Sequence, residues 1–115
     1  LPTLEAALKR GPDDVALLKR AAWIMATSSD AGARNGARAI ELADRAVAKT
    51  GGRDPIALDV LAAACAEAGQ FDRALEAVRR GLALAPSGDT SGPLQMMRGQ
   101  AEMFQARQPI RTREW

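Results

Sequence analysis

The sequence predicts an all-α fold built from antiparallel helix hairpins. Alanine occupies 25 of the 115 positions, and it has the highest helix propensity of all residues. Apolar residues recur at the spacing of three and four that marks one face of a helix, and no stretch alternates with the period of two that a half-buried strand needs. Breakers rich in glycine and proline divide the chain into short segments, so neighbouring helices must turn back on one another.

The first half of the chain contains three predicted helices. Residues 3–10 form a short amphipathic helix that ends at Gly11-Pro12. Asp13 or Asp14 can accept hydrogen bonds from the free amides that begin a second helix, which runs to about Thr27. The breaker stretch 28–36 follows. A third helix over 36–50 carries one apolar stripe, which consists of Ala39, Ile40, Ala43, Ala46 and Val47.

Three more helices are predicted in the second half. Asp54 followed by Pro55 is the pair that opens a helix, and this helix runs to Ala68. Gly69-Gln70 separates it from a helix over 71–84. Ser91 or Gly92 before Pro93 opens the last helix after a linker. Its apolar stripe is Leu94, Met97, Ala101 and Phe104.

Composition excludes several classes of function. The chain has no histidine, so it lacks the Ser-His-Asp, Cys-His and HExxH arrangements of hydrolases and metalloproteases. Its single cysteine, Cys65, cannot form an internal disulfide or a cysteine-rich metal site, and its alanine neighbours indicate a buried structural thiol. No glycine-rich phosphate loop is present. We therefore expect no enzymatic activity, no cofactor and no metal ion.

Charge and hydropathy limit the partners. Sixteen basic residues nearly balance fourteen acidic ones, which does not favour nucleic-acid binding. The longest apolar runs, 61–66 and 82–85, are far shorter than the roughly 20 residues that span a membrane. Residues 107–115 contain three arginines and one glutamate, and we expect a mildly basic, solvated tail.

Residues 54–86 resemble a tetratricopeptide repeat. With Pro55 at the first position of the repeat, Pro86 falls on the closing proline of the motif. Cys65 replaces the usual tyrosine and Gly81 the usual alanine, and both small residues predict closer packing of the helices. The residues that match the pattern of large and small positions are Leu58, Leu61, Ala62, Cys65, Ala74, Val78 and Gly81.

A second copy of the repeat lies upstream. Pro12 matches a closing proline, which makes Val15 the first position, and the second helix matches five residues late because the turn at 28–36 is enlarged. The resemblance implies the C-terminal portion of a longer repeat protein that forms a right-handed solenoid, and the bias toward alanine, arginine and glycine is typical of a GC-rich bacterial source. It divides the chain into the end of a preceding repeat helix (1–12), a repeat with an enlarged inter-helix turn (13–52), a second repeat (53–86), a linker and capping helix (87–106) and the basic tail (107–115).

The resemblance implies a non-catalytic scaffold that binds a peptide or a partner helix in a concave groove. The first helix of each pair lines that groove in this family. Lys19 and Trp23 lie one helical turn apart and offer a cation beside an aromatic plane. The alternative is that Trp23 is a packing residue and Lys19 is solvated. The candidate groove residues are Lys19, Arg20, Trp23, Thr27, Asp59 and Glu67.

A structural role is the alternative function. The chain would then pack end to end with copies of itself, as a homo-oligomer, or with other chains of an assembly. The incomplete first repeat suggests that its leucines are covered by a preceding part of the chain or by a partner. The methionine-rich last helix is either a second adhesive surface or a cap on the preceding pair of helices. The candidate assembly residues are Leu4, Leu8, Met96 and Met103.

Overall fold

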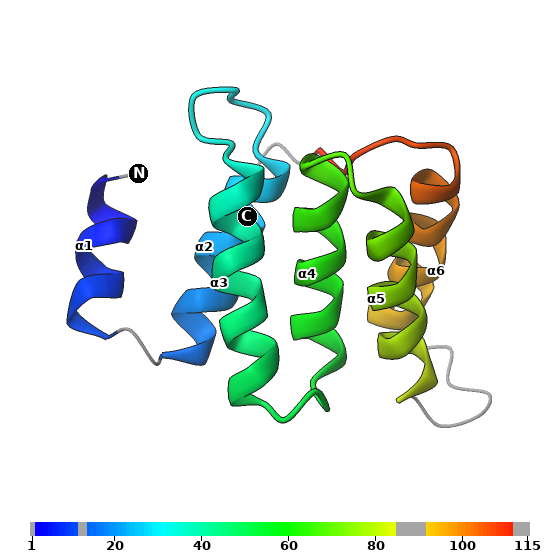
Figure 1. The fold of residues 1–115 in the computed structure, drawn as a ribbon, viewed down its shortest axis with the longest axis horizontal. Coiled ribbons are helices and arrows are strands. Elements are labelled where there is room, and N and C mark those ends of the chain that lie inside the picture. The colour runs from blue at the N-terminus through cyan, green and yellow to red at the C-terminus, as the bar shows by residue number, and fades with distance from the viewer. Residues whose placement is uncertain (1, 12–13, 85–91, 112–115) are drawn as a thin grey trace.

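The all-α prediction is confirmed. The computed structural model describes residues 2–11, 14–84 and 92–111, without the side chains of 2–4 and 92–96, and no strand occurs in this part of the chain. Figure 1 shows the helices following one another in a row along the longest dimension of a 40 × 28 × 22 Å molecule, and the row is two helices deep where α2 lies behind α3 and α6 behind α5. They are α1 (Pro2–Arg10), α2 (Val15–Thr27), α3 (Gly36–Lys49), α4 (Pro55–Glu67), α5 (Phe71–Ala83) and α6 (Gly92–Gln105).

Three helices begin at a side chain that caps them. Asp14, Asn35 and Asp54 each accept a hydrogen bond of 2.9–3.1 Å from a backbone amide two or three residues further on. These bonds satisfy amides that have no partner within the helix. The predicted cap at Asp54 is confirmed, and Asp14 is the one of the two candidate aspartates that caps α2.

Glycines end two of the helices by reversing the chain. Gly51 and Gly52 follow α3 with φ of 66° and 72°, and Gly69 follows α4 with φ of 81°. This left-handed conformation is open to glycine at little cost. The amide of Gly52 donates to the carbonyl of Val47 at 2.9 Å, so the turn also satisfies a carbonyl at the end of α3. The predicted breaks after these two helices are confirmed.

Helix α4 is the centre of the molecule. It packs against α2, α3 and α5, and its ten consecutive residues from Ala57 to Ala66 are all buried. Six of these ten residues are alanine or cysteine, whose small side chains let neighbouring helices approach closely. Cys65 is fully buried, as predicted, and burial raises the pKa of its thiol to about 11.

Helix α6 packs against α5 at a glycine. A Cβ atom at Gly81 would lie 2.5 Å from the terminal methyl of Met97 and 3.5 Å from the Cβ of Leu58. Met97 itself is only 1% exposed. The closer packing that Gly81 predicts is therefore present, and Met97 contributes to a cap on the preceding helix pair rather than to a free surface.

Helix α1 packs on α2 at one end of the row. Leu8 is 3% exposed and belongs to the main apolar cluster, so this chain covers it already and the expected cover from upstream is not needed there. The side chain of Leu4 lies outside the described residues. Glu5 also joins α1 to α3 through hydrogen bonds of 3.1 and 3.2 Å from Arg38. None of the helices in the described part of the chain is long and apolar enough to cross a membrane.

The start of α3 lies against the backbone of the turn after α4. A Cβ atom at Gly36 would lie 3.0 Å from the backbone nitrogen of Ala68 and 3.2 Å from its Cα. We predict that Gly36→Ala lowers the free energy of unfolding by about 1–2 kcal/mol, because the turn would have to move. Urea denaturation measures this effect.

Gly99 is the matched control. It lies in α6, and a Cβ atom there would meet nothing within 4 Å. Gly99→Ala should raise the free energy of unfolding by about 0.5–1 kcal/mol, because alanine loses less backbone entropy in a helix. Equal effects of the two substitutions would show that Gly36 has no special packing role.

Candidate functional site

The predicted groove residues come from two neighbouring helices, α2 and α4, which pack against each other. Lys19 of α2 donates to the carboxylate of Asp54 at the start of α4, at 2.8 Å. At the other end, Arg34 of the α2–α3 turn donates to the Ser28 carbonyl at 2.8 Å and forms an ion pair of 3.5 Å with Glu67. The two helices are therefore tied together at both ends. We call the side that carries the following residues the α2–α4 face: Lys19, Trp23, Thr27, Asp59 and Glu67.

Lys19 is engaged within the chain. Its side chain is 24% exposed, and its ammonium group binds the same Asp54 that caps α4. Burial of Asp54 opposes ionisation, but the Lys19 ion pair and the amide of Ile56 outweigh it and lower the pKa of the Asp54 carboxyl. The structure thus differs from both expectations for Lys19, since it is neither solvated nor free to grip a carboxylate. Its cation is used to fix α4 against α2.

Trp23 and Thr27 lie one turn apart on α2. Trp23 is half-buried and packs against the apolar core, so part of its ring stays accessible. Thr27 is fully buried, and its hydroxyl donates to the Trp23 carbonyl at 2.7 Å. Thr27 is therefore not accessible to a partner, and its hydroxyl group is already hydrogen-bonded inside the fold. Arg20 is exposed.

Asp59 is buried without a partner. It is 9% exposed, and its Oδ1 atom accepts no hydrogen bond. Burial raises the pKa of its carboxyl from the usual 3.8 to about 7, because the ionised form loses its hydration. Sequence reasoning placed Asp59 on an open groove wall, whereas the packing around α4 leaves little of it accessible. A cation or a hydrogen-bond donor brought next to it would stabilise the ionised form.

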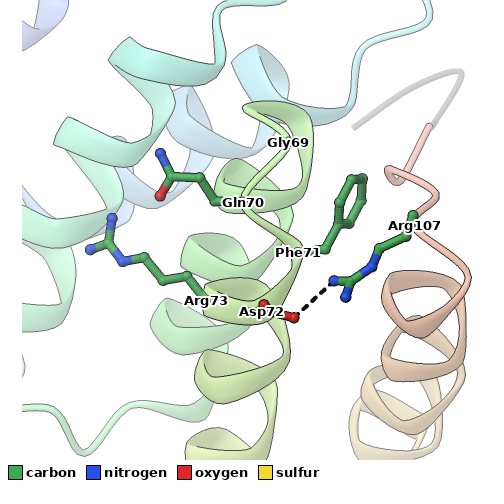
Figure 2. A pocket seen from close by; sticks show the side chains of 6 residues that line it. All are labelled: Gly69, Gln70, Phe71, Asp72, Arg73 and Arg107. Atoms are coloured by element: carbon green, nitrogen blue, oxygen red, sulfur yellow. Dashed lines mark hydrogen bonds and ion pairs between the residues drawn. The ribbon is translucent and has the colours of Figure 1, made fainter.

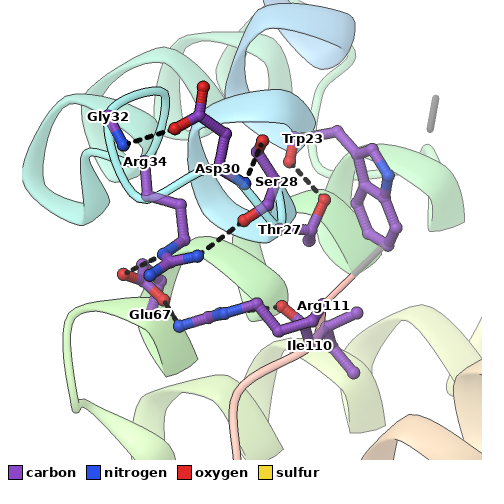
Figure 3. Close-up of polar contacts among 9 residues, drawn as sticks. All are labelled: Trp23, Thr27, Ser28, Asp30, Gly32, Arg34, Glu67, Ile110 and Arg111. Atoms are coloured by element: carbon purple, nitrogen blue, oxygen red, sulfur yellow. Dashed lines mark hydrogen bonds and ion pairs between the residues drawn. The ribbon is translucent and has the colours of Figure 1, made fainter. Parts of the chain in front are cut away.

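Glu67 is the meeting point of three distant segments. Arg34 reaches it from the enlarged turn and Arg111 from the C-terminal segment, with an Arg111–Glu67 ion pair of 2.7 Å (Figure 3). We call these three residues the Glu67 junction. Asp30 organises the enlarged turn, since its carboxylate accepts a hydrogen bond of 2.9 Å from the Gly32 amide. The extra residues of 28–36 thus form an ordered loop that presents Arg34 to the end of α4.

The described part of the C-terminal segment keeps Arg107, Gln108 and Arg111 exposed but buries one residue in the fold. Its described residues end at 111, and within them Ile110 is 7% exposed and belongs to the same apolar cluster on which Trp23 packs. Figure 3 shows the segment passing the end of α4, with the Arg111 guanidinium reaching Glu67. The burial of Ile110 was not predicted, because net charge gives no information about a single aliphatic residue. Burial of Ile110 stabilises the docked segment by roughly 1.5–3 kcal/mol.

A reversal of the chain at Arg107 directs the segment back toward α4. Arg107 has φ of 59°, which costs a residue with a side chain roughly 1–2 kcal/mol. Its guanidinium donates to the carboxylate of Asp72 at 2.9 Å and lies 5.9 Å from the centre of the Phe71 ring (Figure 2). These contacts to the start of α5 offset part of the cost of the left-handed conformation.

The same residues border an open hollow on the surface. It has a volume of about 550 Å³, and in Figure 2 its Arg107 and Asp72 side chains bond to each other. A smaller hollow of about 120 Å³ lies between α3 and α5, beside the Arg73–Asp44 ion pair. Among the residues that the structure describes, no group of three or more histidine, cysteine, aspartate or glutamate side chains could hold a metal ion. The larger hollow is lined by Gly69, Gln70, Phe71, Asp72, Arg73 and Arg107.

The candidate assembly residues are only partly placed. Met103 is half-buried and packs against the core, and the side chain of Met96 lies outside the described residues. Sequence reasoning missed Arg34, Ile110 and Arg111. The only local signal for Ile110 is that it is the one aliphatic residue of the tail, directly after Pro109.

No protein-family model matches the chain, and neither a curated protein nor a solved structure matches it. The chemistry of the site therefore rests on its own geometry. That geometry offers a half-buried aromatic ring, an unpartnered buried carboxylate and a second carboxylate that already holds an arginine. Such a set can bind apolar and cationic side chains.

Asp59 should make stability depend on pH. The raised folded-state pKa means that stability falls as pH rises from about 4 to about 7 and is level above that range. We predict that Asp59→Asn unfolds with nearly the same free energy as wild type near pH 4 and becomes more stable by roughly 1–4 kcal/mol above pH 7. Urea denaturation across this pH range gives the free energy of unfolding of wild type and variant. Asp54 and the other carboxylates are the same in both chains, so their contributions cancel in the difference. A difference that stays constant with pH would contradict the prediction.

Proposed function

We propose that this chain is a non-catalytic protein-interaction scaffold that binds a peptide segment of a partner on its α2–α4 face. One observation carries the proposal: a non-helical segment of the chain itself, residues 108–111, lies against the end of this face. Ile110 is buried there, and Arg111 pairs with Glu67 at 2.7 Å. A surface that accepts an aliphatic and an arginine side chain from one segment has the chemistry to accept them from another.

The charges of the face favour a basic partner. Asp59 and Glu67 lie eight residues apart on α4, which corresponds to about 12 Å along a helix. The lysine of the same face is occupied by Asp54. Among the described residues no ion pair reaches Asp59, so an arginine or lysine of a partner would relieve a buried carboxylate. Trp23 supplies a half-exposed ring for an apolar side chain or for a cation.

The likeness to tetratricopeptide repeats supports the same function. In this proposal the hairpins α2–α3 and α4–α5 are two repeat units (13–52 and 53–86), and α6 (within 87–106) is the cap of a solenoid. The first helices of the pairs, α2 and α4, then form the binding side, as that family uses them. Stacked hairpins of this kind are stabilised by contacts between neighbours, which leaves one side of the first helices for ligands.

Selection of peptides tests this function. A displayed library of random peptides selected on the immobilised chain should be enriched in sequences that combine aliphatic or aromatic residues with arginine or lysine. Trp23→Leu should lower the affinity for the enriched peptides about tenfold, because leucine keeps an apolar side chain but removes the face of the ring. Fluorescence anisotropy of the labelled peptides measures the affinity.

Arg79→Ala is the matched control for the selection. Arg79 is exposed on α5, a helix that carries none of the residues of the α2–α4 face, and its replacement should leave affinity unchanged. The proposal that the α2–α4 face binds peptides would be overturned if the selection enriched no sequence. It would also be overturned if wild type and Trp23→Leu bound the enriched peptides with equal affinity.

Self-assembly remains the second candidate function. Ile56 and Leu84 are the large hydrophobic residues most exposed in the described part of the chain, at 41% and 43%. They lie at the first turn of α4 and just after α5, and these positions meet at one end of an antiparallel hairpin. The pair thus offers an apolar patch to a second copy.

Light scattering over a series of concentrations tests self-assembly. If copies associate through this patch, the molar mass rises with concentration for wild type and stays at one chain for Ile56→Glu. A wild-type molar mass of one chain at every concentration would contradict assembly and leave the α2–α4 face as the working surface.

A further inference from the structure

The C-terminal segment lies where the proposed function places a ligand. This inference rests on that function and deepens it. The segment begins at the left-handed Arg107, where the amide of Gln108 donates to the carbonyl of Met103 at 2.9 Å and ends α6. From there the chain returns toward α4, and Ile110 enters the apolar cluster.

Within its described residues, 108–111, the segment is attached to the rest of the fold mainly by two side chains. Ile110 supplies apolar burial, and Arg111 supplies one ion pair with the 16% exposed carboxylate of Glu67. The Arg111 guanidinium also donates to its own neighbour, the Ile110 carbonyl, at 2.9 Å. Gln108 is exposed. An attachment of one aliphatic and one arginine side chain resembles a bound peptide more than an element of the core.

The acceptor side of this contact is built independently of the segment. Glu67 is held at the end of α4, and Arg34 pairs with it from the ordered turn at 3.5 Å. Glu67 therefore keeps a cation when the segment leaves, which lowers the cost of an open state. Trp23, on the neighbouring helix α2, packs against the same apolar core as Ile110 and keeps part of its side chain accessible.

We propose that residues 108–111 are an internal ligand that occupies the binding face, and that a partner segment with an aliphatic residue followed by arginine displaces them. The partner makes the contacts that Ile110 and Arg111 make now. A face that is occupied most of the time binds an external peptide more weakly in proportion to its open fraction. Release of the internal segment should therefore raise the affinity for such a peptide without any change on α2 or α4.

Competition in the full-length chain tests this inference. The probe is a fluorescein-labelled peptide Arg-Gln-Pro-Ile-Arg, which copies residues 107–111. Anisotropy should show that the double variant Ile110→Ser/Arg111→Ser binds it at least about tenfold more tightly than wild type. Gln108→Ala is the matched control in the same segment, and it should bind as wild type does.

Two altered probes test the chemistry of recognition. A peptide with glutamate in place of the last arginine, and one with serine in place of isoleucine, should each lose binding to the double variant. Glu67→Gln added to the double variant should weaken binding of the unaltered peptide. It should not weaken binding of the glutamate-ending peptide any further. Equal binding of all three peptides would overturn the assigned chemistry.

The remaining outcomes separate this inference from the proposed function. Equal affinity of wild type and the double variant would show that the segment does not compete, although the face could still bind the peptides found by selection. Binding to neither chain would show that the segment is only a part of the core. If circular dichroism shows that the double variant is unfolded, the single variant Arg111→Ser replaces it in the test, because it retains Ile110. An affinity of that single variant equal to wild type would then overturn the inference.

Discussion

Burial of the run from Ala57 to Ala66 in α4 is the constraint on which the rest of the structure depends. A helix surrounded by α2, α3 and α5 must be apolar on every side and thin enough for three neighbours, and the alanine-rich run between Ala57 and Ala66 satisfies both conditions. Asp59 is the one ionisable carboxylate within that run, and it remains without a hydrogen bond for its Oδ1 atom. Close packing thus creates both the stable centre of the molecule and its most unfavourable polar group.

Ion pairs join several of the helices. Lys19 and Asp54 join α2 to the start of α4, Arg73 and Asp44 join α5 to α3, and Arg107 joins the end of α6 to the start of α5. Ion pairs at this degree of exposure contribute little to stability, typically about 0–1 kcal/mol each. Their effect is on geometry, because each pair is made only when two helices have the correct relative position. Apolar packing therefore holds the helices together, and the charges select how they are aligned.

The Glu67 junction connects this architecture to function. It joins the enlarged turn, the end of α4 and the C-terminal segment at one carboxylate. The enlarged turn lengthens the first hairpin without interrupting either helix, and its effect is to bring Arg34 to a position that a tight turn would not reach. In the proposed mechanism this carboxylate keeps one arginine permanently and exchanges the other. A binding face can then be occupied from within the chain and opened by a partner.

The sequence by itself determined the six helices, because the information for them is local. Helical spacing, the Asp54-Pro55 start and the glycines after α3 and α4 act over a few residues, and their boundaries agree with the structure to within one or two positions. It also determined that Cys65 is buried. Of the candidate site, the sequence identified Trp23 and Glu67 as residues of one side of α2 and α4, but not the partners that surround them.

Only the tertiary structure decided which charges meet and where the tail lies. Arg34, Glu67 and Arg111 are far apart in the chain, and no periodicity relates an exposed arginine to a carboxylate on another helix. Arg107 takes a conformation that local preference disfavours, because Asp72 and Phe71 of another helix hold its side chain. Thr27 and Asp59 were expected on an open wall and are buried, since their exposure depends on neighbours rather than on their own helix. Helices follow from contacts within a turn, whereas the site follows from contacts that exist only after the helices have packed.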